Sequence, residues 1–177
     1  MEKNELTKAP KLEELLTTKE IKKSNNINKI TDKIYLGDIE GATNYNYFKN
    51  ENIHNILSIV NEPPEYPSSL KINHKCLKFE DKDNTNIVKY FQECIDFIEV
   101  SDKIYIHCLF GISRSPTIVI AYLIWKTHSN FENVYNFVKK RRPNIEPNKG
   151  FISQLKQFDN MLKNNNYELK KFNFASI

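Results

Sequence analysis

The sequence predicts an α/β fold in which helices flank a central, twisted and mainly parallel sheet. Two observations lead to this prediction. Short apolar segments with the composition of strands alternate with longer segments whose apolar residues recur at helical spacing. The 177 residues also suffice for one ordinary domain with its own buried core, and no internal repeat divides them.

Four short segments are expected to form the strands. Each is rich in Ile, Leu, Val or Tyr and ends at turn-forming residues or at a change to helical spacing. They are residues 34–36 before Gly37, 53–60, 72–79 and 103–107. Three prolines within 61–69 require a loop after the second of these strands.

Helical spacing of apolar residues predicts helices at 86–100, 131–142 and 148–163, and a shorter one at 42–50. Pro143 ends the second of these, and Asn148 is expected to cap the third. A further helix, opened by Pro116 in its first turn, is apolar almost all round. This last helix is therefore expected to lie inside the fold.

The predicted domain covers residues 28–164. Residues 1–27 form a polar extension whose Leu12, Leu15, Leu16 and Ile21 are spaced for one weak amphipathic helix. We interpret the extension as a mobile arm or a surface helix rather than as a partner-binding segment. Residues 165–177, rich in Asn and Lys, are expected to be a loose tail.

The composition disfavours several classes of protein. The net charge of +4, from 26 basic and 22 acidic residues, is too small to indicate nucleic-acid binding. No apolar run has the length of a bilayer, and the amino terminus has no apolar signal region. The three cysteines form neither a disulfide framework nor a zinc-binding pair. We expect a cytoplasmic protein, with the nucleus as a further location, that binds neither nucleic acid nor membrane; its oligomeric state is left open.

The segment 107–115, His-Cys-Leu-Phe-Gly-Ile-Ser-Arg-Ser, gathers residue types that are scarce elsewhere in the chain. The whole sequence has four histidines, three cysteines and four glycines, and only three arginines. Yet His107, Cys108, Gly111 and Arg114 stand within eight consecutive positions. A bare Cys-x5-Arg spacing is weak evidence, but here it lies between a predicted apolar strand and a predicted buried helix. In this setting it indicates a site that binds an anion.

The chemistry of a phosphate group explains this combination of residues. A loop that leads from a strand into a helix amino terminus directs successive backbone N–H groups at one point. Gly111 permits a backbone conformation that a side chain would forbid. Arg114 adds a planar fork for two phosphate oxygens, which lysine cannot imitate. In the same field Cys108 is expected to be a thiolate nucleophile, and Ser115 is placed to donate a hydrogen bond to its sulfur.

These residues resemble the signature loop of the dual-specificity branch of the protein tyrosine phosphatases, in the version of the MAP kinase phosphatases. The resemblance covers residues 28–160. Its other motifs are Ile34-Tyr35-Leu36-Gly37 with Ala42, Ala121-Tyr122-Leu123, Lys140-Arg141-Arg142-Pro143, and Pro147-Asn148 with Gly150-Phe151. The resemblance implies a protein tyrosine phosphatase-like fold and a phosphocysteine intermediate on Cys108, without a metal or other cofactor. It also implies that the phosphoryl group is bound by Leu109, Phe110, Gly111, Ile112, Ser113 and Arg114.

The family also supplies a general acid, which protonates the leaving group, from a loop upstream of the signature. Carried over to this sequence, that residue is Asp81; Asp83 is the rival, and Glu80 is a third candidate. The resemblance further implies that His107 hydrogen-bonds the loop and fixes the cysteine. Asn148 is expected to brace the loop in addition to capping its helix.

Several other residues are interpreted as structural. The basic run at 139–142 is read as cations at the carboxyl end of a helix, where the dipole favours them. A nuclear-import or substrate-docking patch is the alternative. The other histidines, His54, His74 and His128, are expected to be ordinary surface or core residues. Cys94 is assigned to the core, and Cys76 to packing rather than to a redox role with Cys108.

The signature loop also bears on the substrate. Residues 109–113 include no Lys, Arg or His, whereas inositol-lipid phosphatases of the superfamily tend to carry lysines there. No segment that would deepen the pocket for phosphotyrosine is apparent. We therefore expect phosphoprotein substrates, kinases among them, with both phosphotyrosine and phosphoserine/threonine accepted. A phosphatase for RNA 5′ ends, glycans or lipids, and a catalytically silent phosphobinding adaptor, are the alternatives.

Overall fold

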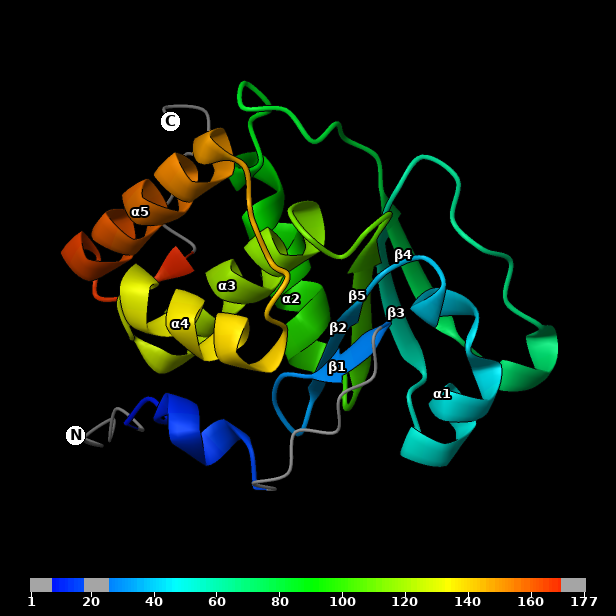
Figure 1. Cartoon of the computed structure of the whole chain (residues 1–177). Coiled ribbons are helices and arrows are strands. Elements are labelled where there is room, and N and C mark those ends of the chain that lie inside the picture. The colour runs from blue at the N-terminus through cyan, green and yellow to red at the C-terminus, as the bar shows by residue number, and fades with distance from the viewer. Residues whose placement is uncertain (1–7, 18–25, 170–177) are drawn as a thin grey trace.

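The computed structural model describes residues 8–17 and 26–169, and its centre is a five-stranded sheet (Figure 1). The strands lie in the order β1 (Ile27–Lys29), β2 (Ile34–Gly37), β5 (Ile104–Cys108), β3 (Asn55–Ile59) and β4 (Asn73–Leu77). β1 runs antiparallel to β2, and all other neighbours are parallel. The expected α/β fold with a mainly parallel sheet is confirmed.

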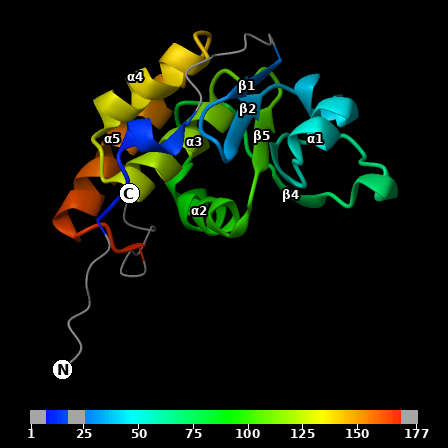
Figure 2. The same cartoon turned by 90° about the horizontal axis from the view of Figure 1, so that it is seen from below.

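Helices cover both faces of this sheet (Figures 1 and 2). On one side lie α2 (Phe91–Val100), α3 (Arg114–Thr127), α4 (Phe131–Arg141) and α5 (Lys149–Asn164). On the other side lies the short helix α1 (Tyr45–Glu51). Single 3-10 turns occupy Leu12–Leu15, Gly41–Thr43, Ser68–Leu70 and Val88–Tyr90. Within the described residues, no helix combines the length and the apolarity needed to span a bilayer.

Helix α3 is the buried helix that its composition predicts. It follows β5 after the loop 109–113, begins at Arg114 and contains Pro116 in its first turn. It packs against the sheet and against α2, α4 and α5. Since β5 is flanked by parallel strands, the loop lies at their carboxyl ends, where α/β sheets usually bind ligands.

Two cores lie on opposite faces of the sheet. The larger core includes Ile106 of β5 and is covered by α2 to α5, and the smaller core includes Tyr105 and is covered by α1. This division arises because successive side chains of a strand point to opposite faces. At the end of β5, His107 is therefore directed to the side of the smaller core and Cys108 to the larger core, of which it is part.

Two elements differ from the predictions. Strand β1 was not predicted, because its three residues are too few to show an alternating pattern. The prediction of an amphipathic helix in the amino-terminal extension is wrong, because Leu12–Leu15 form one 3-10 turn and Leu16 is extended. The fourth residue of that predicted helix, Ile21, lies outside the described residues.

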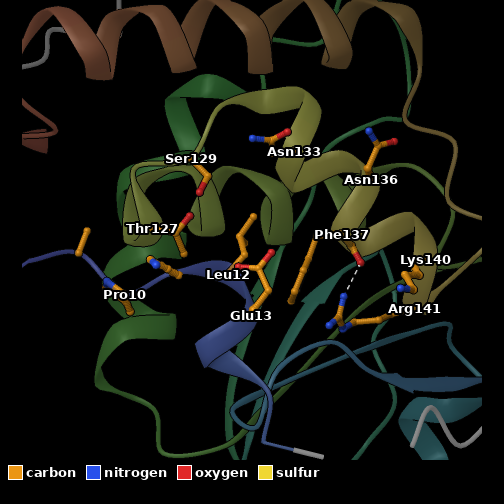
Figure 3. Close-up of a pocket in the computed structure, with 12 residues that line it drawn as sticks. Pro10, Leu12, Glu13, Thr127, Ser129, Asn133, Asn136, Phe137, Lys140 and Arg141 are labelled. Carbon is orange, nitrogen blue, oxygen red and sulfur yellow. Dashed lines mark hydrogen bonds between the residues drawn. The ribbon is translucent and has the colours of Figure 1, made fainter. Parts of the chain in front are cut away.

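The described part of the extension, residues 8–17, packs on the domain. Leu12 is only 6% exposed and belongs to the larger core. It lines one cavity with Thr127 of α3 and Phe137 of α4 (Figure 3). The backbone N–H of Asp32 donates to the carbonyl of Leu15 at 2.8 Å, and the Asp32 carboxylate accepts from the N–H of Thr17 at 2.8 Å. This segment is thus held by both apolar and polar contacts.

Candidate active site

The loop between β5 and α3 brings the predicted nucleophile beside a helix amino terminus. Cys108 is the last residue of β5 and is 2% exposed. Ser115, buried in the first turn of α3, donates a hydrogen bond from Oγ to Cys108 Sγ at 3.2 Å. The hydroxyl therefore faces the sulfur, as the sequence led us to expect.

Gly111 fits its position in the loop for two reasons. Its φ of +64° lies in the left-handed region, which glycine adopts without a steric cost. A Cβ atom at this position would lie 2.3 Å from the carbonyl oxygen of Gly37 and 2.5 Å from Arg142 Nη2. The backbone conformation and the available space both require glycine.

Arg142 holds the loop from behind. Its side chain is 1% exposed; Nε donates to the carbonyl of Gly111 at 2.9 Å, and Nη2 to that of Phe110 at 3.3 Å. Nη1 donates to Asn28 Oδ1 at 2.7 Å, and Asp38 forms an ion pair at 3.8 Å. The C=O and N–H of a trans peptide point in opposite directions. Fixing these carbonyls toward Arg142 therefore turns the N–H groups that follow them away from it.

The interpretation of the run 139–142 as cations at a helix end is wrong for Arg142. It stands just beyond α4 and is among the most buried large side chains of the described chain. A buried guanidinium needs several acceptors, which the loop carbonyls supply. The sequence carried two signals for Arg142: arginine is scarce in this lysine-rich chain, and Arg142 belongs to the motif Lys140-Arg141-Arg142-Pro143 of the resemblance.

Asp81, from the loop after β4, reaches the signature loop. Its Oδ1 accepts hydrogen bonds from Ser113 Oγ at 2.7 Å and Asn148 Nδ2 at 2.8 Å. Its Oδ2 lies 3.6 Å from Arg114 Nε. The rival carboxylates make other contacts: Asp83 accepts from the backbone N–H of Gly150, and Glu80 forms an ion pair with Lys82.

The first turns of α5 hold this acidic loop against the signature loop. Asn148 caps α5 by accepting from the N–H of Phe151 at 2.9 Å, and its own N–H donates to Ser113 Oγ at 3.1 Å. Gln154 accepts from the N–H groups of Ile87 and Val88 at 2.8 and 3.3 Å, and donates to the carbonyl of Thr85 at 2.9 Å. Sequence reasoning identified Asn148 through its cap position, but nothing in the sequence pointed to Gln154.

His107 supports the loop from the opposite face of β5. It is fully buried, with Nδ1 at 3.2 Å from the carbonyl oxygen of Cys108 and Nε2 at 2.7 Å from Ser58 Oγ. Burial lowers the pKa of His107 to about 4. The imidazole is therefore neutral near pH 7 and can donate only one hydrogen bond.

The strand register separates Cys76 from Cys108. Cys76 is opposite Ser58, which is opposite His107, whereas Cys108 is opposite Ile59. Cys76 and Cys108 thus point to opposite faces of the sheet from strands about 10 Å apart. A disulfide needs Cβ atoms within about 4.5 Å. The assignment of Cys76 to packing is consistent with this geometry.

The exposed rim of the loop is apolar. Leu109 and Phe110 are 43% and 66% exposed, and Ile112 is half-buried.

Among the residues that the structure describes, no group of three or more His, Cys, Asp or Glu side chains could hold a metal ion. The chemistry available at this place is that of a thiol, a guanidinium, a carboxyl group and backbone amides.

Comparison with known proteins identifies the family. The family model "Dual specificity phosphatase, catalytic domain" matches residues 34–161. The chain is 34% identical over 144 residues to Dual specificity protein phosphatase 1B of Arabidopsis thaliana, covering 78% of this chain and 85% of that protein. The solved structure of DUSP15 superposes with a TM-score of 0.75 at 29% identity, covering 85% of this chain and 99% of that one. The chain belongs to the dual-specificity phosphatase family, as the signature loop predicted.

Other relatives are much longer proteins. The chain is 38% identical over 133 residues to MAP kinase phosphatase with leucine-rich repeats protein 1 of Dictyostelium discoideum, covering 73% of this chain. It spans only 16% of that protein, and 19% of the related protein 2. The similarity to these two relatives is thus confined to one part of their length.

Proposed function

We propose that this domain hydrolyses phosphotyrosine and phosphoserine/threonine in proteins through a phosphocysteine intermediate on Cys108. One observation carries the proposal: Asp81, which comes from a separate loop, contacts Ser113 and lies beside Arg114 of the signature loop. Ser115, the residue after Arg114, donates a hydrogen bond to Cys108 Sγ, so a thiol, a guanidinium and a carboxyl group belong to one cluster. These are the groups that a phosphatase reaction of this kind uses, which supports the proposal.

The phosphoryl group would bind inside the loop, to its backbone N–H groups and to Arg114. Within the described chain, Arg114 Nε is a buried donor that makes no hydrogen bond, and Asp81 lies 3.6 Å from it. A buried donor of this kind is costly unless a ligand accepts from it. A phosphate oxygen is a suitable acceptor for the guanidinium fork.

In the first chemical step, Cys108 Sγ attacks phosphorus. The P–S bond forms as the ester P–O bond breaks, and the protonated carboxyl group of Asp81 gives its proton to the leaving oxygen. In the second step, the Asp81 carboxylate takes a proton from water, whose oxygen attacks phosphorus as the P–S bond breaks. The thiolate that leaves is stabilised by the hydrogen bond from Ser115.

The apolar rim supports phosphoproteins as the substrate class. Leu109 and Phe110 offer apolar surface to a polypeptide beside the phosphorylated residue. Between Cys108 and Arg114 there is no cationic side chain to bind the further phosphates of an inositol lipid. Because two relatives are named MAP kinase phosphatases, phosphorylated kinases are the first protein substrates to test.

The assignment of Asp81 predicts a dependence on the leaving group. Asp81→Asn should reduce kcat by about 100-fold or more on a phosphoserine peptide, whose alkoxide needs a proton. The loss should be far smaller on an activated aryl phosphate, whose leaving group departs unprotonated. Asp83→Asn is the matched control and should retain activity on both substrates. Equal losses on the two substrates, or a larger loss from Asp83→Asn, would contradict the assignment.

Three further measurements test the overall function. Cys108→Ser should abolish turnover of an aryl phosphate while the protein still binds a phosphopeptide, and retained turnover would refute the mechanism. Wild-type turnover should be blocked by vanadate; absence of turnover would instead support a phosphobinding adaptor.

A panel of phosphopeptides, RNA 5′ ends, phosphoglycans and inositol lipids tests the proposed substrate class. Preference for a non-protein member of the panel would overturn the proposal of phosphoprotein substrates.

A further inference from the structure

A chain of hydrogen bonds runs beneath the signature loop from the nucleophile toward the edge of the sheet. The carbonyl of Cys108 lies 3.2 Å from His107 Nδ1, and His107 Nε2 lies 2.7 Å from Ser58 Oγ. Ser58 Oγ in turn lies 2.8 Å from His74 Nε2. His74 belongs to β4, one of the two edge strands of the described sheet, so these hydrogen bonds link three neighbouring strands.

The strand register explains why these side chains meet. Ser58 of β3 is directly opposite His107 of β5, and His74 of β4 is opposite Ile56, two residues before Ser58. Residues two apart in a strand share a face, so all three polar side chains project to the same side of the sheet. This is the side of the smaller core, away from the face that Cys108 occupies.

Packing holds both imidazole rings in place. His107 is stacked on Tyr105 with centroids 5.5 Å apart, and His74 meets the edge of Tyr66 at 5.0 Å. Burial raises the pKa of both tyrosines, that of Tyr66 to about 12, so both phenols are neutral near pH 7. Ser58 and His107 are fully buried and His74 is half-buried.

The number of protons on each group determines which partner donates in each of these three hydrogen bonds. The Cys108 carbonyl can only accept, so His107 donates from Nδ1. Neutral His107 carries one proton, so its Nε2 must accept the only proton of the Ser58 hydroxyl. Ser58 Oγ is then the acceptor for an N–H at His74 Nε2. Protonation of His74 leaves this order unchanged, because Nε2 carries a proton in the charged ring as well.

We propose that Ser58 and His74 are positioning residues that fix the Nδ1–H tautomer of His107 and thereby orient the peptide carrying the nucleophile. The bond between His107 and the Cys108 carbonyl sets the orientation of the first peptide of the signature loop. The tautomer of a histidine is set by the hydrogen bond at its other nitrogen. Ser58 supplies that bond, and His74 supplies the donor that directs the Ser58 proton. The effect on catalysis rests on the proposed function; the tautomers themselves do not.

The tautomers can be measured directly in the wild-type protein. With 15N-labelled histidine, NMR near pH 7 should show His107 protonated at Nδ1 and unprotonated at Nε2. His74 should show a proton at Nε2. Either ring in the opposite state would overturn the proposal, whether or not the protein hydrolyses any phosphoester.

Variants then test the consequence for Cys108. Ser58→Ala should slow alkylation of Cys108 by iodoacetate at pH 7, and kcat on an aryl phosphate, by about tenfold, from the loss of one buried hydrogen bond. Ser58→Thr retains the hydroxyl and should restore both rates. His74→Phe, which keeps a ring but has no donor, should show a smaller loss in both rates.

A matched control is Ser101→Ala. Ser101 is a buried serine whose Oγ donates to the Phe97 carbonyl, at the end of α2. The control should leave alkylation and kcat unchanged. Equal rates for Ser58→Ala and wild type would refute the proposal, as would equal losses for Ser58→Ala and Ser101→Ala. Normal tautomers and alkylation in a protein that turns over no phosphoester would contradict the proposed function instead.

Discussion

At the scale of single residues, two arginines serve the signature loop from opposite sides. Arg114 opens α3 and directs its buried Nε toward the site, whereas Arg142 binds two loop carbonyls from behind. The sequence indicated Arg114 through its fixed spacing from Cys108. The role of Arg142 depends on carbonyl groups 31 and 32 residues upstream, and no local pattern records such contacts.

Arg142→Lys should reduce kcat/KM by about tenfold or more without unfolding the protein. Lysine keeps the charge but cannot bind both carbonyls and Asn28 with one planar group. Arg141→Lys is the control. Arg141 is the adjacent residue, but its guanidinium lies over the ring of Phe137 at 3.4 Å and donates to the Phe137 carbonyl (Figure 3). Steady-state kinetics on an aryl phosphate would measure both variants, and equal effects would contradict the role of Arg142.

The buried His107 also predicts how stability depends on pH. In the unfolded chain its pKa returns to about 6.5, whereas burial lowers it to about 4 in the folded protein. Between these values only the unfolded state binds the proton, so the free energy of unfolding should fall as pH falls from about 6.5 to about 4. The two pKa values correspond to a total of about 3 kcal/mol. Urea unfolding at several pH values should show a shallower dependence for His107→Gln; an unchanged dependence would contradict the assignment.

At the scale of elements, α5 positions the acidic loop. Its cap residue Asn148 contacts Asp81, and six residues later Gln154 binds the backbone of Thr85, Ile87 and Val88, just before and at the start of the 3-10 turn that precedes α2. Gly150 is required between them, since a Cβ atom there would lie 1.9 Å from the Asp83 carbonyl oxygen. The amino-terminal turns of one helix thus hold a loop that precedes it by more than 60 residues.

Gln154→Ala should loosen this loop and reduce turnover of poor leaving groups by about threefold to tenfold, since three backbone hydrogen bonds are lost. Activated aryl phosphates should be hydrolysed at nearly the wild-type rate. Hydrogen exchange at Ile87 and Val88 should become faster. Gln157→Ala, on the exposed side of the same helix, is the matched control and should change none of these quantities. Unaltered exchange in Gln154→Ala would refute the role of α5 in holding the loop.

At the scale of the whole molecule, residues 8–17 extend the larger core beyond the matched family region. Leu12 is buried with residues of α3 and α4, and the backbone of Asp32 ties the segment to the turn before β2. A leucine in a polar extension did not reveal this contact, because its partners follow it by more than 100 residues in the sequence. The segment contributes to the stability of the domain.

Leu12→Ala should lower the free energy of unfolding by about 2 kcal/mol, the low end for a buried leucine, because a terminal segment can adjust around the cavity. Leu16→Ala is the control; Leu16 is less buried and should cost under about 1 kcal/mol. Urea denaturation would measure both, and kcat on an aryl phosphate should stay unchanged. Equal and small effects would show that the segment does not pack as part of the core.

The sequence by itself determined the α/β class, the position of the principal strands and helices, and the signature loop. These features depend on residues close together in the chain: apolar periodicity within each element, and the fixed spacing from Cys108 to Arg114. For the carboxylate, the resemblance favoured Asp81, and the tertiary structure placed it, rather than Asp83 or Glu80, against the loop. The tertiary structure alone decided why Arg142 is buried and how Ser58 and His74 reach His107. Such contacts join residues that are distant in sequence, and they arise only when strand register and helix packing bring those residues together.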